Sequence, residues 1–147
     1  MTYEKIKWKV PGLFKTDPEA VFKELQTLEE RTPDAIVDLA RNSDSVLHSM
    51  FDWDDEVAAE KWRKQQARII SCNLIVETRE QKGEVIELRL MHVSEEKKSY
   101  EEINYFVEHE NEYAKLLKRA KMDLNSFKTK YHILKELSPI FEAIDVL

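Results

Sequence analysis

The 147-residue sequence is poor in the residues that interrupt regular structure. It contains only two glycines, Gly12 and Gly83, and four prolines. Glycine and proline are unfavourable inside helices and strands, and they concentrate in turns. A β-sandwich needs many turns, so this scarcity favours long helices. With 42% hydrophobic residues, a chain of this length can bury a core, and we expect a single domain over 1–147.

Three further absences exclude classes of protein and of site. The single cysteine, Cys72, cannot form an internal disulfide, and no CxxC pair is present to bind zinc. No apolar run reaches the roughly 18 residues of a membrane helix. The first ten residues lack the apolar segment of a signal peptide. We therefore expect a protein of a reducing cytoplasm that has no membrane partner.

The sequence also has no excess of positive charge. It contains 23 Lys and Arg residues and 29 Asp and Glu residues, so its net charge is −6. Proteins that coat nucleic acid are usually basic, so binding here would depend on a local basic face. Two segments offer one. Residues 61–68, KWRKQQAR, carry four positive charges, and residues 115–130 carry six against the single acid Asp123.

The N-terminal part of the chain, 1–72, is expected to be helical. Two segments mark helix starts, because each combines a capping side chain with a proline in the first turn: residues 16–19, where Thr16 and Glu19 have capping-box spacing, and residues 32–34. A short third helix is expected at 47–51. Before these helices, apolar and lysine side chains alternate over 6–10, which is typical of a short extended segment.

Residues 52–70 read as one helix whose charges are segregated along its length. Asp52 or Asp54 can cap it, acidic residues follow in the first turn, and basic residues occupy the second half. This order complements the helix dipole without any reference to function. Four residues at helical spacing are expected to face the core: Ala58, Ala59, Trp62 and Ile69.

Strand patterns begin after Ser71. Alternating apolar and polar residues on both sides of Lys82-Gly83 predict one antiparallel β-hairpin over 73–93. A lone hairpin is marginally stable in water, so we expect another element to cover one face. The next segment, 94–112, is acidic and is expected to form a loop that leads into a helix.

The C-terminal helices are expected over 100–147, with a break at Ser138-Pro139. Apolar residues recur at alternating steps of four and three, as in a coiled coil, and this spacing fits packing within the chain or a homodimer through the C-terminal helix. The predicted fold class is α+β and mostly helical, with short N-terminal helices, one antiparallel β-hairpin and a long C-terminal helix. The seam consists of Tyr113, Leu117, Ala120, Leu124, Phe127, Tyr131 and Leu134.

Four segments together resemble an uncharacterised family of small proteins from tailed phages and prophages of Gram-positive hosts. They are WKVPGLFK (8–15), TPDAIVDLAR (32–41), LHSMFDWDDEVAAEKWRKQQAR (47–68) and FKTKYHILKELSPIFEAID (127–145). The third carries the signature LHxxFxWDDxxAAxxxRxxQAR. The chain departs from the family at Val46, where members often have proline, and at Trp62, where they often have tyrosine. The resemblance implies a phage or prophage origin and brings no catalytic residue.

Three functions are compatible with these patterns. The leading hypothesis is a non-enzymatic accessory protein that binds nucleic acid through the basic part of the 52–70 helix. The alternative is a protein-interaction module acting on a host or phage protein, as an inhibitor, an anti-defence protein or an assembly factor. The candidate nucleic-acid-binding residues are Lys61, Arg63, Lys64, Gln66 and Arg68.

The third hypothesis is a divalent-metal-dependent nuclease. Asp52, Asp54 and Asp55 supply the oxygen ligands that Mg²⁺ prefers, although helix capping already explains their positions. The sequence contains no glycine-rich phosphate loop, no nucleophile elbow and no HExxH motif. We therefore assign no catalytic residue and expect no cofactor. The four histidines are scattered, and packing or capping is their expected role.

Overall fold

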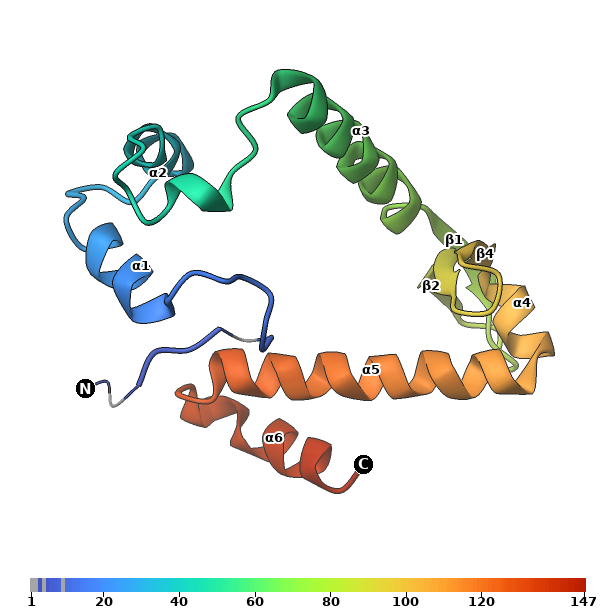
Figure 1. The fold of residues 1–147 in the computed structure, drawn as a ribbon. Helices are drawn as coiled ribbons and strands as arrows, with labels where there is room; N and C mark the ends of the chain where they lie inside the picture. The colour runs from blue at the N-terminus through green and yellow to red at the C-terminus, as the bar shows by residue number, and fades with distance from the viewer. Residues whose placement is uncertain (1–2, 4, 9) are drawn as a thin grey trace. The chain divides into compact units, whose positions relative to one another are not determined.

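The computed structural model describes residues 3, 5–8 and 10–147. It is an α+β structure with 53% helix, short N-terminal helices, two antiparallel hairpins and a long C-terminal helix (Figure 1). The predicted fold class is confirmed, and the second hairpin is an addition to it. The chain divides into two compact units, Met1–Arg63 and Lys64–Leu147. The single-domain organisation remains a prediction.

The first unit contains helix α1 (Pro18–Leu25), helix α2 (Pro33–Ala40) and the short 3-10 helix η1 (His48–Met50). The predicted helix starts are confirmed, but Asp17 caps α1 in place of the predicted Thr16. The Asp17 carboxylate accepts a hydrogen bond from the backbone N–H of Ala20, and the Thr32 hydroxyl accepts one from Ala35. Both helices have proline in the first turn, where no intrahelical N–H donor is lost.

The predicted extended segment over 6–10 does not form a strand in its described part. Lys9, which belongs to that segment, lies outside the described residues. Trp8 instead packs against the core of the first unit, and its indole N–H donates to the backbone carbonyl of Thr16 at 2.9 Å.

The core of the first unit joins α1, α2 and the residues before η1. Val21, Ala40 and Leu47 are buried and in contact, and Trp8 and Leu39 are among the half-buried residues around them. A hydrogen bond beside this core also joins α1 to the segment before η1: the Ser45 hydroxyl donates to a carboxylate oxygen of Glu24 on α1 at 2.6 Å. Sequence-distant segments are thus held together by apolar and polar contacts at one place.

In the second unit, strands β1 (Ile75–Arg79) and β2 (Val85–Arg89) form the predicted hairpin. Gly83 lies in its turn with φ = 83°, a conformation that residues with a Cβ rarely adopt. The register pairs Val76 with Leu88 and Thr78 with Ile86, so these side chains share one face.

The second hairpin was not predicted. Strands β3 (Met91–Ser94) and β4 (Ser99–Glu102) pair in a separate antiparallel sheet, where we expected a continuation of the first hairpin and an acidic loop. Leu90 separates the two sheets, because its N–H donates to Leu74 and its carbonyl accepts from Ile103. The strand expected over 85–93 is therefore divided between two hairpins.

Four further elements complete the second unit: helix α4 (Ile103–Glu108), helix α5 (Glu110–Tyr131), the 3-10 helix η2 (Lys135–Leu137) and helix α6 (Ser138–Asp145). Phe106 on α4 is fully buried. Helix α6 lies beside the C-terminal end of α5 (Figure 1), where Phe127 and Phe141 have ring centroids 6.4 Å apart. The position predicted for the break, Ser138-Pro139, is wrong: α5 ends earlier, at Tyr131, so Leu134 of the predicted seam lies outside it, and Ser138 begins α6.

Candidate nucleic-acid interface on helix α3

Helix α3 (Asp55–Cys72) carries all five candidate binding residues. Its start is fixed by Asp54, whose carboxylate oxygen accepts hydrogen bonds from the backbone N–H groups of Glu56 and Val57 at 3.0 and 3.1 Å. Two of the N–H groups that a helix start leaves unpaired are satisfied in this way. Asp52 and Asp54 were the two predicted caps, and Asp54 is the residue that caps the helix.

The predicted core-facing side of α3 is wrong for its two large residues. Trp62 is 57% exposed and Ile69 is 45% exposed, while Ala58 and Ala59 are half-buried. No residue of α3 is buried. Helical spacing showed that these side chains share a side of the helix, but it carries no information on whether another element covers that side.

The candidate residues do not all lie on one side of α3. Successive residues of an α-helix are rotated by about 100°, so residues three and seven positions apart lie close together around the axis. Lys61, Lys64 and Arg68 have this spacing, and we call these three residues the basic side. Arg63 lies about 130° away from it by the same rotation. Gln66 lies nearly opposite the basic side, about 170° away.

The cations of α3 differ in what they already contact. The Lys61 ammonium donates to the Asp52 carboxylate at 2.7 Å, and Arg63 is 3.7 Å from Glu60. Lys64 forms no ion pair with any residue that the structure describes. Exposed ion pairs contribute little stability, so a phosphate can displace the Asp52 carboxylate from Lys61 at low cost.

The acidic residues before α3 have structural roles. Asp54 caps the helix, Asp52 pairs with Lys61, and Asp55 lies in the first turn. Within the described part of the chain, no three His, Cys, Asp or Glu side chains lie close enough to hold a metal ion together. The nuclease hypothesis therefore gains no support from the arrangement of these carboxylates.

The tryptophan and histidine beside the acidic residues also have packing roles. Trp53 stacks on His48 with ring centroids 5.1 Å apart, and its indole N–H donates to the backbone carbonyl of His48. His48 Nδ1 lies 2.8 Å from the carbonyl oxygen of Ala40. The predicted packing role of this histidine is confirmed.

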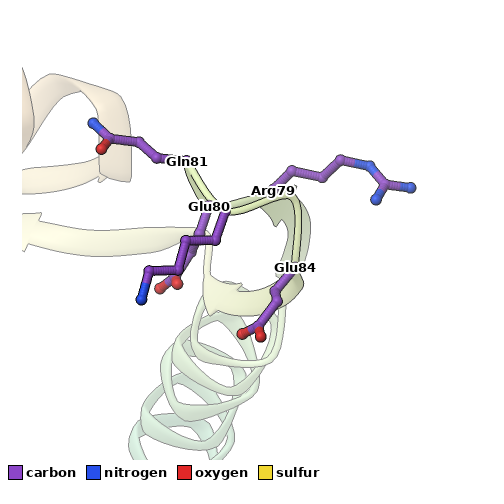
Figure 2. Close-up of a pocket in the computed structure, with 5 residues that line it drawn as sticks. Arg79, Glu80, Gln81 and Glu84 are labelled. Carbon is purple, nitrogen blue, oxygen red and sulfur yellow. The ribbon is translucent and has the colours of Figure 1, made fainter.

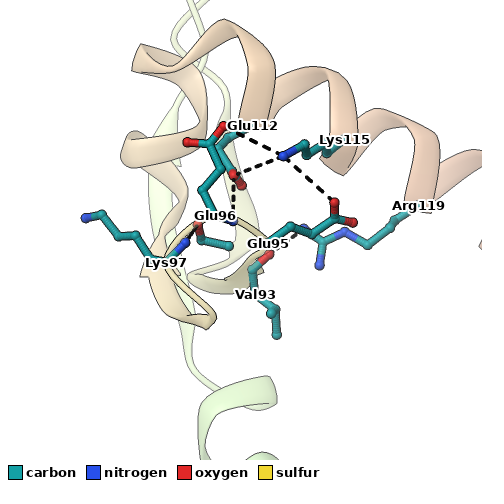
Figure 3. Close-up of polar contacts among 8 residues, drawn as sticks. Val93, Glu95, Glu96, Lys97, Glu112, Lys115 and Arg119 are labelled. Carbon is teal, nitrogen blue, oxygen red and sulfur yellow. Dashed lines mark hydrogen bonds and ion pairs between the residues drawn. The ribbon is translucent and has the colours of Figure 1, made fainter.

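Half of the six cations in the second basic segment, 115–130, are engaged within its own unit. Lys115 lies 3.7–3.9 Å from the carboxylates of Glu95, Glu96 and Glu112, and Arg119 donates to the backbone carbonyl of Val93 (Figure 3). Lys128 pairs with Asp145 of α6. The other three are Lys118, Lys121 and Lys130. The rotation of about 100° per residue places Lys121 and Lys130 on opposite sides of α5, so this segment does not form a single basic side.

Sequence reasoning missed the polar cluster around Glu112, which is fully buried. One of its carboxylate oxygens accepts from the backbone N–H of Glu96 at 3.1 Å, while the other accepts no hydrogen bond from any residue that the structure describes. The cluster fastens the β3–β4 turn to α5 (Figure 3). The spacing of Glu112, Lys115 and Arg119 on one side of a helix was the available signal.

His92 on β3 provides a pH-dependent test of this packing. Burial, followed by the positive charge of Arg89, lowers the pKa of His92 below its usual value of 6.5. The unfolded chain therefore binds a proton at a higher pH than the folded chain does. We expect His92 to favour the folded state above pH 6.5, and this contribution to be lost as the pH falls from 6.5 through the lower folded pKa.

Urea unfolding at a series of pH values checks this expectation. Below pH 6.5 the wild-type protein should lose stability more steeply than His92→Gln, which cannot titrate in this range. His109→Gln is the control, because it replaces an exposed histidine of the same unit. Identical pH profiles for the wild type and His92→Gln would contradict the assignment.

A shallow hollow at the β1–β2 turn is not built as a binding site. It is lined by charged and amide side chains of the turn itself: Arg79, Glu80, Gln81, Lys82 and Glu84. Figure 2 shows Arg79 and Gln81 extending to different sides of the turn. Converging polar groups around an apolar pocket would be needed for a small ligand, and this hollow does not provide them.

No helix among the described residues combines the length and the apolar composition that crossing a bilayer requires. No protein-family model, curated protein or solved structure matches the chain.

Proposed function

We propose that this protein is a phage- or prophage-encoded, non-enzymatic accessory protein that binds nucleic acid in the host cytoplasm. The observation that carries the proposal is the basic side of α3, where Lys61, Lys64 and Arg68 follow one side of an exposed helix. The phage setting rests on the four sequence segments that resemble phage and prophage proteins.

The geometry of α3 suits a nucleic-acid backbone. The helix has 18 residues, and an α-helix of this kind fits the major groove of duplex DNA. From Lys61 to Arg68 the rise is about 10 Å, so three cations are spread along a length that spans several phosphates. With a net charge of −6 for the whole chain, binding depends on this local face and is weakened by salt.

Charge reversal on the basic side tests the proposal. In anisotropy titrations with labelled duplex and single-stranded DNA, Lys64→Glu/Arg68→Glu should weaken binding by about tenfold or more at low salt. The slope of log K against log salt should also become shallower by about two, because two phosphate contacts are removed.

The matched control is Arg63→Glu, a charge reversal on the same helix. Arg63 lies away from the basic side and already pairs with Glu60, so this variant should keep most of the affinity. Equal losses of affinity in both variants would mean that binding depends only on net charge, which would contradict binding through the basic side. Absence of salt-sensitive binding by the wild-type protein would contradict the proposal itself.

The alternative function, recognition of a host or phage protein, is favoured by a different observation on the same helix. Trp62 and Ile69 are exposed on the side of α3 away from the basic residues, and exposed aromatic side chains frequently anchor protein interfaces. A partner that is retained by the wild type and by Lys64→Glu/Arg68→Glu, but lost in Trp62→Ala, would favour this alternative.

A further inference from the structure

The apolar seam of α5 is left uncovered along most of its length. We use "α5 seam" for Tyr113, Leu117, Ala120 and Leu124, which recur at steps of four, three and four. Tyr113 is 53% exposed, Leu117 is 47% exposed and Leu124 is 38% exposed. A continuous apolar stripe on an exposed helix is typical of a surface that pairs with another helix.

The contacts of α5 within its own unit use other positions. Toward the N-terminal end, Glu112 and Arg119 bind the β3–β4 hairpin (Figure 3). These residues lie about 100° around the helix from the α5 seam. At the C-terminal end, Phe127 and Lys128 contact α6. The α5 seam is therefore not used by the described contacts that hold α5 in its unit.

We propose that the α5 seam pairs with the α5 seam of a second copy of this chain in the antiparallel orientation. The distribution of charge along α5 favours a second copy of the chain as the partner. Glu110 is exposed in its first turn and Lys130 is exposed in its last turn. An antiparallel pair brings the acidic end of each helix to the basic end of the other, and it also opposes the two helix dipoles favourably.

A parallel pair is disfavoured by Glu110. This residue is seven positions before Leu117 and therefore continues the seam by one heptad. In a parallel pair in register, the two Glu110 carboxylates would face each other across the helix contact, and like charges at such a contact are destabilising. In the antiparallel pair, the two Glu110 carboxylates lie at opposite ends of the contact and do not face each other.

The antiparallel arrangement also has a register in which every seam residue faces an apolar side chain. Tyr113 faces Leu124 of the second copy, and Leu117 faces its Ala120, which gives four apolar layers related by two-fold symmetry. About three heptads are needed for a strong coiled coil. The shorter α5 seam therefore predicts a dimer that forms and dissociates with protein concentration.

Sedimentation velocity over a range of protein concentrations tests the dimer without nucleic acid. The wild type should change from monomer to dimer as concentration rises. Leu117→Asn/Leu124→Asn should require about tenfold or more protein to dimerise, because it removes apolar side chains from all four layers. Its far-UV circular dichroism should match the wild type, since both residues are exposed.

The matched control is Met122→Asn, which removes another exposed apolar side chain from α5, on the opposite side of the helix. It should dimerise like the wild type. A wild type that stays monomeric at every concentration, or a Met122→Asn variant that is weakened as much as the seam variant, would overturn the proposal.

Disulfide trapping tests the orientation. In a Cys72→Ser background, which keeps an oxygen acceptor for Arg89, Tyr113→Cys and Leu124→Cys proteins are mixed and oxidised. The antiparallel pair should give the mixed 113–124 disulfide as the main product. Predominant 113–113 and 124–124 disulfides would show parallel pairing and overturn the stated orientation. Neither assay depends on the nucleic-acid proposal.

Discussion

Phe106→Ala is expected to lower the free energy of unfolding of the second unit by about 3–5 kcal/mol. Phe106 is fully buried on α4, with its ring edge-on to those of His92 at 5.8 Å and Tyr105 at 5.6 Å. Removing the ring loses its transfer from water and leaves a cavity between α4 and the β3–β4 hairpin. Urea unfolding followed by far-UV circular dichroism measures the change.

The control for this substitution is the next residue on the same helix. Val107 is exposed, so Val107→Ala should change the free energy of unfolding by no more than about 0.5 kcal/mol. A loss below about 1 kcal/mol for Phe106→Ala would contradict the central packing role assigned to this ring.

Leu47→Ala is expected to lower the free energy of unfolding of the first unit by about 2–5 kcal/mol. Leu47 is buried against Val21 and Ala40, where α1, α2 and the segment before η1 meet. The three tryptophans, Trp8, Trp53 and Trp62, all lie in the first unit. Tryptophan fluorescence in a urea titration therefore follows the unfolding of this unit.

Leu13→Ala provides the comparison, because it is the same chemical change at an exposed position. Its midpoint in urea should stay close to that of the wild type, whereas the midpoint of Leu47→Ala should fall clearly. Similar midpoints for the two variants would mean that Leu47 does not hold the core of the first unit.

The features that could be predicted from the sequence depend on local chemistry. Asp17 and Thr32 cap helices because a side-chain oxygen reaches nearby N–H groups, and the Gly83 turn requires a backbone conformation that glycine adopts readily. These interactions span only a few residues. Helix α3 was predicted for the same reason, and Asp54 begins it as a local cap.

The features that could not be predicted depend on contacts between distant residues. Strand β4 has only four residues and includes two glutamates, so its pattern is typical of a polar loop. Its pairing with β3 and the burial of Glu112 arise together, because Glu112 accepts from the backbone of the turn between the strands. Neither the β3–β4 segment nor Glu112 indicates this contact when its local sequence is considered by itself.

The candidate site on α3 also has features that could be predicted from the sequence and features that could not. The positive charges of α3 and their helical position could be predicted, and helical spacing alone could have separated Arg63 and Gln66 from the basic side. The exposure of Trp62 could not be predicted, because amphipathic spacing does not show whether another element covers a helix.

Mapping of backbone chemical shifts during a titration with duplex DNA tests the interface on α3 most directly. At low salt, the largest changes should fall on Lys61, Lys64, Arg68 and their neighbours, and they should shrink as salt is added. Changes confined to α5, or no changes at low salt, would contradict binding through the basic side of α3.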